Sequence, residues 1–201
     1  MLKNNIARLF GALVLAAAGH ATAEVALPRD ILNQIPKGHA VLSSASGDLN
    51  RDGLNDWLVV LHMKNEKAIA HKSNTPGRPL WLFLQTPNGR YTLTKHNDDV
   101  VEGVGGDWQC DSFGDGTGGV VIKNGYFTVE HEIACGAHST DFITFRYAPD
   151  LKDWIFHKRV FENWVMNNSS DAKADALILD SRVVETGKGK PPVLFERYQP
   201  N

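Results

Sequence analysis

The chain has few cysteines, no excess of basic residues and no long hydrophobic segment. Two of its 201 residues are cysteine, and 21 lysine and arginine residues stand against 23 aspartate and glutamate residues. This composition disfavours a zinc site built from clustered cysteines and a surface charged for nucleic acid. The longest apolar run, residues 9–18, is about half as long as the roughly 20 residues that a membrane-spanning helix needs.

The N-terminal segment has the pattern of a cleavable export signal. Two basic residues precede the apolar run, and Ala21-Thr22-Ala23 supplies the small residues that favour cleavage. We expect residues 1–23 to be a signal peptide and residues 24–201 to form a single domain that is periplasmic or secreted, with no membrane anchor. Cleavage removes two basic residues and no acidic one, so the formal charge falls from −2 to −4, and no nucleic-acid partner is expected.

The two cysteines, Cys110 and Cys135, stand alone in a chain with an export signal. Thiols are usually oxidised outside the cytoplasm, so we predict that they form one disulfide bond. Closing the intervening loop contributes roughly 3 kcal/mol to stability in the chain-entropy model. No Cys-x-x-Cys spacing is present, which disfavours a reactive or metal-binding cysteine.

Residues 48–56 carry the strongest functional signal of the sequence. Oxygen-bearing side chains recur at every second position through Asp48, Asn50 and Asp52, the next residue is a glycine that permits a sharp turn, and Asp56 adds another carboxylate. Three carboxylates within so short a segment repel one another unless a cation lies between them, and Ca²⁺ prefers such flexible sets of oxygen ligands. The alternative is a turn without metal, because Asp, Asn and Gly favour turns for their own reasons.

The loop differs from an EF-hand in the segment that comes after it. An EF-hand needs a bidentate glutamate at loop position twelve and an exiting helix. Here position twelve is Val59, which lies in the apolar, β-forming run of residues 57–61. We therefore expect the loop to lead into a strand and to hold a static ion, in contrast to a calcium sensor that moves helices apart.

The segment from Gly47 to Val60 resembles the calcium loop and following strand of FG-GAP or VCBS-type repeats, the units of integrin-like β-propellers. With the lead-in Ile35-Pro36-Lys37-Gly38 it also resembles a group of uncharacterised bacterial secreted proteins that carry one copy of the motif. The resemblance implies a Ca²⁺ ion bound by the side chains of Asp48, Asn50, Asp52 and Asp56 and by the carbonyl oxygen of Leu54. Because a single copy is present, a closed propeller is not expected.

Periodicity over the rest of the chain predicts a mainly β fold. Residues 27–35 have the spacing of one short N-terminal helix, residues 64–78 have the composition of an exposed loop, and the apolar residues 193–195 are expected to dock on the core. We predict two antiparallel four-strand meanders, packed as a sandwich or half-propeller, with residues 176–184 as a candidate ninth strand. The eight expected strands are 39–46, 56–63, 80–84, 90–94, 119–123, 126–130, 141–147 and 154–158.

The glycine-rich segment 102–119 is a candidate interaction loop. It contains no lysine or arginine, which disfavours a phosphate site. Trp108 and Phe113 are the aromatic residues that it would present outward, and Trp108 is the stronger candidate for contact with a protein partner. Three aspartates that recur at every fourth position are candidate ligands of a second cation or, alternatively, ordinary turn residues: Asp107, Asp111 and Asp115.

No catalytic motif stands out. Glu132 and its neighbour His131 point to opposite faces if the segment is a strand, and His138 does not complete the His-Glu-x-x-His spacing of zinc proteases. The sequence therefore favours a non-enzymatic, calcium-stabilised binding protein of the bacterial envelope, for example an inhibitor or immunity protein, with no catalytic residue. The alternative is a periplasmic hydrolase or carbohydrate-active protein whose acidic residues converge in three dimensions, with candidates Glu130, Glu132 and Asp111.

Overall fold

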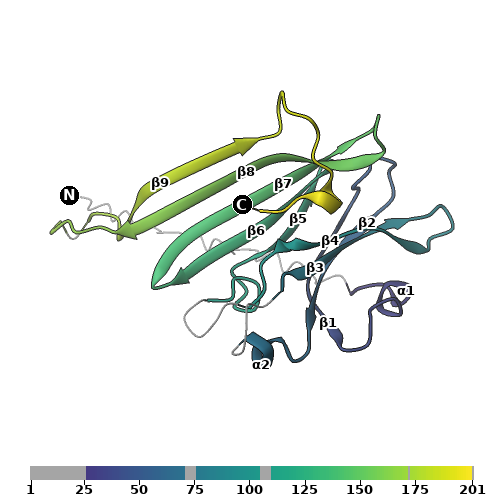
Figure 1. Cartoon of the computed structure of the whole chain (residues 1–201), viewed down its shortest axis with the longest axis horizontal. Coiled ribbons are helices and arrows are strands. Elements are labelled where there is room, and N and C mark those ends of the chain that lie inside the picture. The colour runs from purple at the N-terminus through teal and green to yellow at the C-terminus, as the bar shows by residue number, and fades with distance from the viewer. Residues whose placement is uncertain (1–25, 71–75, 105–109, 172, 201) are drawn as a thin grey trace, which may run out of the picture.

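Two antiparallel sheets make up the structure, a computed structural model that describes residues 26–70, 76–104, 110–171 and 173–200 (Figure 1). Within each sheet the strands are hydrogen-bonded in chain order. The first sheet consists of β1 (His39–Gly47), β2 (Asp56–Met63), β3 (Arg78–Gln85) and β4 (Tyr91–Val101). The second consists of β5 (Gly119–Lys123), β6 (Tyr126–Cys135), β7 (Ala137–Ala148), β8 (Asp153–Met166) and β9 (Leu177–Thr186). The expected signal peptide, residues 1–23, lies outside the described residues.

The mainly β fold expected from the sequence is confirmed, and the candidate ninth strand is β9, which pairs with β8. The expected N-terminal helix is α1 (Arg29–Leu32), and a short 3-10 helix, η1 (Phe195–Arg197), lies near the C-terminus. A further helix, α2 (Glu66–Ala70), lies in segment 64–78, which we expected to be a loop, because five residues are too few for helical periodicity to show. None of the helices in the described parts of the chain is long and apolar enough to cross a membrane.

The two sheets share one hydrophobic core. Leu58 and Leu82 of the first sheet and Ile143 and Phe145 of the second belong to the same cluster and are fully buried. Two antiparallel sheets that bury their inner faces against each other form a sandwich. This is one of the two arrangements that the sequence predicted.

The first sheet also buries its other face. Ile31 of α1 packs there with Trp57, Val59 and Phe83 in a second cluster. Because both faces of β2 are covered, residues 56–61 are buried in succession and not alternately. This burial on both faces explains why the apolar run after the acidic loop is unbroken.

The C-terminal segment closes one end of the core, as its apolar residues led us to expect. The ring of Phe195 is fully buried and lies edge-on to those of Phe127 and Phe145, with centroids 5.3 and 5.2 Å away. The side-chain amide of Asn97 in β4 donates to the carbonyl oxygens of Phe195 and Tyr198 at 2.6 and 2.8 Å. The chain end is therefore fixed by aromatic packing on the second sheet and by hydrogen bonds to the first.

A disulfide bond joins Cys110 to Cys135, as the sequence predicted, and the two Cα atoms are 6.0 Å apart. Cys135 ends β6, at the hairpin to β7, and Cys110 precedes β5. The bond therefore ties the segment before the second sheet to a hairpin tip of that sheet.

The second sheet extends past the first. In Figure 1 the far ends of β7, β8 and β9 lie well away from β1 to β4. Six aliphatic side chains of β8 and β9 are 39–64% exposed. Because neighbouring residues of a strand point to opposite faces, these side chains are divided between the two faces of the sheet. They are Val165, Met166, Ile178, Leu179, Val183 and Val184.

Candidate functional site

Residues 48–55 form the loop that connects β1 to β2, and Gly47 and Asp56 pair across its base. The backbone enters the left-handed region twice, at Arg51 with φ of 64° and at Gly53 with φ of 83°. The sharp turn expected at Gly53 is thus present. Arg51 adopts a conformation that costs free energy for a residue with a side chain, so contacts elsewhere must hold it.

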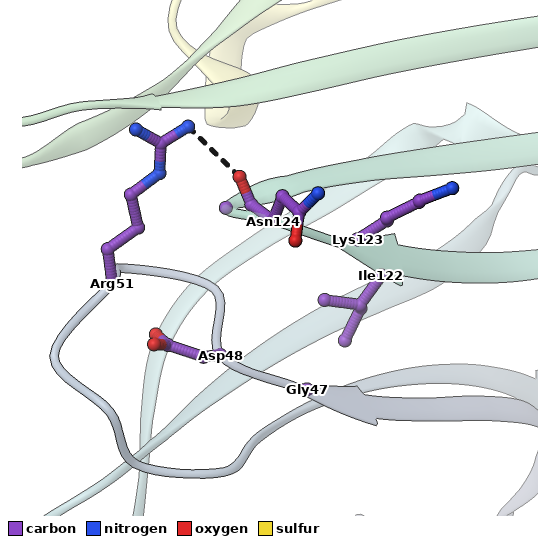
Figure 2. A pocket seen from close by; sticks show the side chains of 7 residues that line it. Gly47, Asp48, Arg51, Ile122, Lys123 and Asn124 are labelled. Carbon is purple, nitrogen blue, oxygen red and sulfur yellow. Dashed lines mark hydrogen bonds between the residues drawn. The ribbon is translucent and has the colours of Figure 1, made fainter.

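The side-chain oxygens of the loop gather around its own backbone. One carboxylate oxygen of Asp48 and the amide oxygen of Asn50 both accept a hydrogen bond from the backbone N–H of Asp52, each at 3.1 Å. The second oxygen of Asp48 accepts from Gly53 N–H at 2.9 Å, and Asp52 accepts from Leu54 N–H at 2.8 Å. Figure 2 shows the Asp48 carboxylate pointing into the loop. The residues at loop positions one, three and five therefore converge.

Asp56 closes the loop from inside the protein. Its side chain is fully buried, and its two oxygens accept hydrogen bonds from the backbone N–H groups of Leu49 and Gln85, both at 2.9 Å. Burial raises its pKa to about 6, against the effect of these two hydrogen bonds, and the negative charges of Asp52 and Asp48 add to the rise. A cation in the loop would offset this repulsion and so lower the pKa of the carboxyl.

The loop offers oxygen atoms of the kind that a hard divalent cation prefers. A carboxylate offers about four lone-pair sites, so the hydrogen bonds made by Asp48 and Asp52 leave sites for a metal. Among the described residues no group of three or more His, Cys, Asp and Glu side chains is placed to hold a metal. The ligand set implied for this loop contains three aspartates, which the structure does not bring together as metal ligands, so the calcium site stays a prediction.

The outer side of the loop lies against the β5–β6 turn of the second sheet. The guanidinium of Arg51 donates to the backbone carbonyl of Asn124 at 3.0 Å (Figure 2). Glycines lie at this approach: Gly125 has a φ of 73°, which favours glycine, and a Cβ on Gly47 would lie 2.8 Å from Ile122. A pocket of about 550 Å³ separates the loop from the turn. The loop thus joins the two sheets at one edge.

The segment 102–119 differs from its expected role where the structure describes it. Trp108 and Asp107 lie outside the described residues. Phe113 is 5% exposed and packs in the core, so its ring is not presented outward, because the core offers it more apolar contact than the surface does. Asp115 is exposed and accepts a hydrogen bond from the backbone N–H of Asp111 at 3.1 Å, as an ordinary turn residue does.

Asp111 belongs to a buried ionic network that the sequence did not reveal. The guanidinium of Arg78, at the start of β3, binds the carboxylate of Asp111 at 2.5 Å and that of Glu66 in α2 at 2.8 Å. Glu66 also contacts Nδ1 of His62 at 3.2 Å. Burial alone would raise the pKa of Asp111, but the hydrogen bonds and charge of Arg78 lower it. A carboxylate neutralised in this way is a poor ligand for a second cation.

His131 and Glu132 of β6 point to opposite faces of the sheet, as expected. His131 is buried, and burial lowers its pKa so that it is neutral at pH 7. Glu132 and His138 lie on the other face and line a pocket of about 290 Å³. Glu162 of β8, which no motif in the sequence singles out, lines the same pocket. Burial raises the pKa of Glu130, and Glu130 does not line this pocket.

The chain matches no family model, and searches of the curated proteins and of the solved structures found no similar protein. The resemblance to FG-GAP and VCBS repeats therefore stays a prediction, and the functional argument depends on the contacts within the structure.

The raised pKa of Asp56 predicts a pH dependence of stability in the absence of metal. Because the folded pKa of about 6 exceeds the unfolded value of about 4, the protonated group stabilises the fold below about pH 4, and this contribution of roughly 2–3 kcal/mol is lost as the pH rises through 6. The side-chain amide introduced by Asp56→Asn does not titrate in this pH range. In EDTA, the free energy of unfolding of the wild type minus that of Asp56→Asn should therefore fall from pH 4 to pH 7.

Urea titration at each pH measures this difference in the free energy of unfolding. The contributions of the other titrating groups cancel, because both proteins contain those groups. The exposed Asp175→Asn is the matched control, and its difference from the wild type should not change with pH. A flat difference for Asp56→Asn would show that the carboxylate is ionised at no cost to the fold.

Replacing Arg78 by leucine should lower the free energy of unfolding by about 3–5 kcal/mol, because Glu66 and Asp111 would stay buried without their partner. Urea denaturation at pH 7 measures the loss. Arg90→Leu, at an exposed position, should change stability by less than about 0.5 kcal/mol. Equal effects of the two substitutions would contradict a structural role for the network.

Proposed function

We propose that this protein is an exported, non-enzymatic binding protein whose fold is stabilised by a Ca²⁺ ion in the loop of residues 48–56. The observation that carries the proposal is the convergence of the Asp48, Asn50 and Asp52 oxygens beside the buried carboxylate of Asp56. With the carbonyl oxygen of Leu54 these groups give a set of oxygen ligands of the kind that Ca²⁺ prefers.

The position of the loop supports a structural role for the ion. The loop contacts the β5–β6 turn through Arg51, so an ion that makes the loop rigid also fixes the two sheets relative to each other. Strands β8 and β9 then present their exposed aliphatic side chains on a rigid support. A partner protein with an apolar surface suits this arrangement, as an inhibitor or immunity-type role requires.

An envelope location agrees with the other features of the chain. The Cys110–Cys135 disulfide is typical of an oxidising compartment, and residues 1–23 have the composition of an export signal. The periplasm or the medium outside the cell contains calcium and partner proteins, so the proposed ion and the proposed partner are both available there.

The proposal predicts that calcium raises the melting temperature of the protein. Calcium at 100 times its dissociation constant should add about 2.7 kcal/mol, or roughly 5–10 °C for a domain of this size. Differential scanning fluorimetry of residues 24–201 in EDTA and in millimolar calcium measures the shift. Asp52→Ala should abolish most of it, and the exposed Asp175→Ala should leave it unchanged.

Identical melting temperatures in chelator and in calcium would show that the loop holds no ion. The same melt in magnesium distinguishes a calcium site from unspecific charge neutralisation, because Mg²⁺ tolerates a flexible oxygen loop poorly.

An alternative function, hydrolysis of an envelope polysaccharide, has one observation in its favour. Glu132 and Glu162 line one pocket together with Trp164, and pairs of carboxylates flank the scissile bond in most glycoside hydrolases. Against this role, Glu162 is paired with Arg182 at 3.3 Å.

Assays for new reducing ends on peptidoglycan fragments and β-glucans distinguish the two functions. We expect no product above the level in buffer. Product that appears with the wild type and is lost in both Glu132→Gln and Glu162→Gln would establish the hydrolase in place of the binding protein.

A further inference from the structure

A pocket of about 490 Å³ lies where the β7–β8 turn meets residues 187–192, the segment between β9 and η1. One wall is apolar and includes Leu151, Ile155 and Pro192. Asp150 is the acidic residue of the described lining. The lining residues that carry or can gain a positive charge are Arg146, His157, Lys188 and Lys190.

An irregularity in the sheet places His157 at this pocket. The register of β7 and β8 shifts between Thr144 and Phe145, which leaves His157 as an extra residue in β8. A bulge of this kind redirects a side chain, and such bulges are common at functional sites. The imidazole lies edge-on to the ring of Tyr126, with centroids 5.2 Å apart, and the His157 carbonyl accepts a hydrogen bond from Gly187 N–H at 3.0 Å.

The segment that carries the two lysines has a defined shape. A Cβ on Gly187 would lie 2.5 Å from the carbonyl oxygen of Phe156, so only glycine permits this approach. Gly189 has a φ of 74°, which again favours glycine. At the far end of the segment the Phe156 N–H donates to the Val193 carbonyl at 2.8 Å. Lys188 and Lys190 therefore project from a backbone that is held at both ends.

The described lining of the pocket carries more positive than negative charge, with three permanent cations and one carboxylate, that of Asp150. Among the described residues none forms an ion pair with Arg146, Lys188 or Lys190. Burial lowers the pKa of His157, and the charges of Arg146 and Lys158 lower it further, as expected where the local potential is positive. Cations that line one pocket without an ion-pair partner repel one another, and a bound anion would relieve that repulsion.

We propose that this pocket binds the phosphate group of a small organic phosphate. Arginine and lysine donate strong, charge-assisted hydrogen bonds to phosphate oxygens. A phosphate monoester carries close to two negative charges at pH 7, which matches three permanent cations better than one carboxylate does. A single phosphate ion would leave most of the 490 Å³ empty, so the apolar wall contacts the organic part of the ligand. The phosphate belongs to a free metabolite or to a lipid headgroup.

Isothermal titration calorimetry with glycerol 3-phosphate, inorganic phosphate and sodium sulfate tests the proposal on residues 24–201 in calcium. Glycerol 3-phosphate should bind at least several-fold more tightly than the two inorganic ions. The double variant Lys188→Ala/Lys190→Ala should weaken that binding about tenfold or more. Lys37→Ala/Lys173→Ala, at two exposed positions that do not line the pocket, should bind like the wild type. The imidazole NMR signals of His157 should shift on binding in the wild type.

Flotation with phosphatidylglycerol vesicles, with phosphatidylcholine vesicles as the control, distinguishes the two sources of the phosphate. Capture by the anionic vesicles that is lost in Lys188→Ala/Lys190→Ala assigns the pocket to a headgroup, and binding of glycerol 3-phosphate without capture assigns it to a free ligand. Three results would overturn the proposal. The two double variants could bind equally well, glycerol 3-phosphate could bind no more tightly than sulfate, or no probe could bind at all. Loop 48–56 lines no part of the pocket, so these outcomes do not depend on calcium binding.

Discussion

The buried carboxylate of Asp56 is the contact on which the arrangement of the two sheets depends. It binds the backbone of Leu49 in the loop and of Gln85 at the end of β3. Leu49 is itself fully buried in the shared core, and its carbonyl accepts a hydrogen bond from the indole N–H of Trp154 in β8 at 3.1 Å. One charged group on β2 thus sets the loop, the neighbouring strand and, through Leu49, the distance to the second sheet. A cation in the loop would offset the free-energy cost of burying the Asp56 carboxylate.

The strands could be predicted from the sequence because their signals are local. β2 has the bounds expected from the apolar run that comes after the loop, and β5 has those expected from the turn at Asn124-Gly125. β6, β7 and β8 are longer than expected. Their additional residues lie in the part of the second sheet that the first sheet does not cover, so no core imposes the alternation of apolar and polar residues that identifies a strand.

Contacts between distant segments could not be predicted in the same way. Arg78 meets Asp111 because the disulfide-bonded segment folds back on the first sheet. Glu162 and Glu132 line one pocket because β6 and β8 lie on either side of β7. Phe113 was expected at the surface since glycine surrounds it in the sequence, yet the core has room for its ring. The hydrogen-bonded turn of the acidic loop was the exception, because its side-chain oxygens lie within nine residues and local spacing alone brings them together.

An acidic region and a basic region lie apart along the edge where the two sheets meet. The acidic loop reaches the second sheet through Arg51, whose guanidinium lies 5.9 Å from the ring centroid of Tyr126, and Tyr126 in turn contacts His157 at the basic pocket. An aromatic ring therefore stands between the two charged regions. Direct ion pairs between them would neutralise both. Because Tyr126 contacts both a guanidinium and an imidazole, it packs the two regions together without neutralising the charge of either.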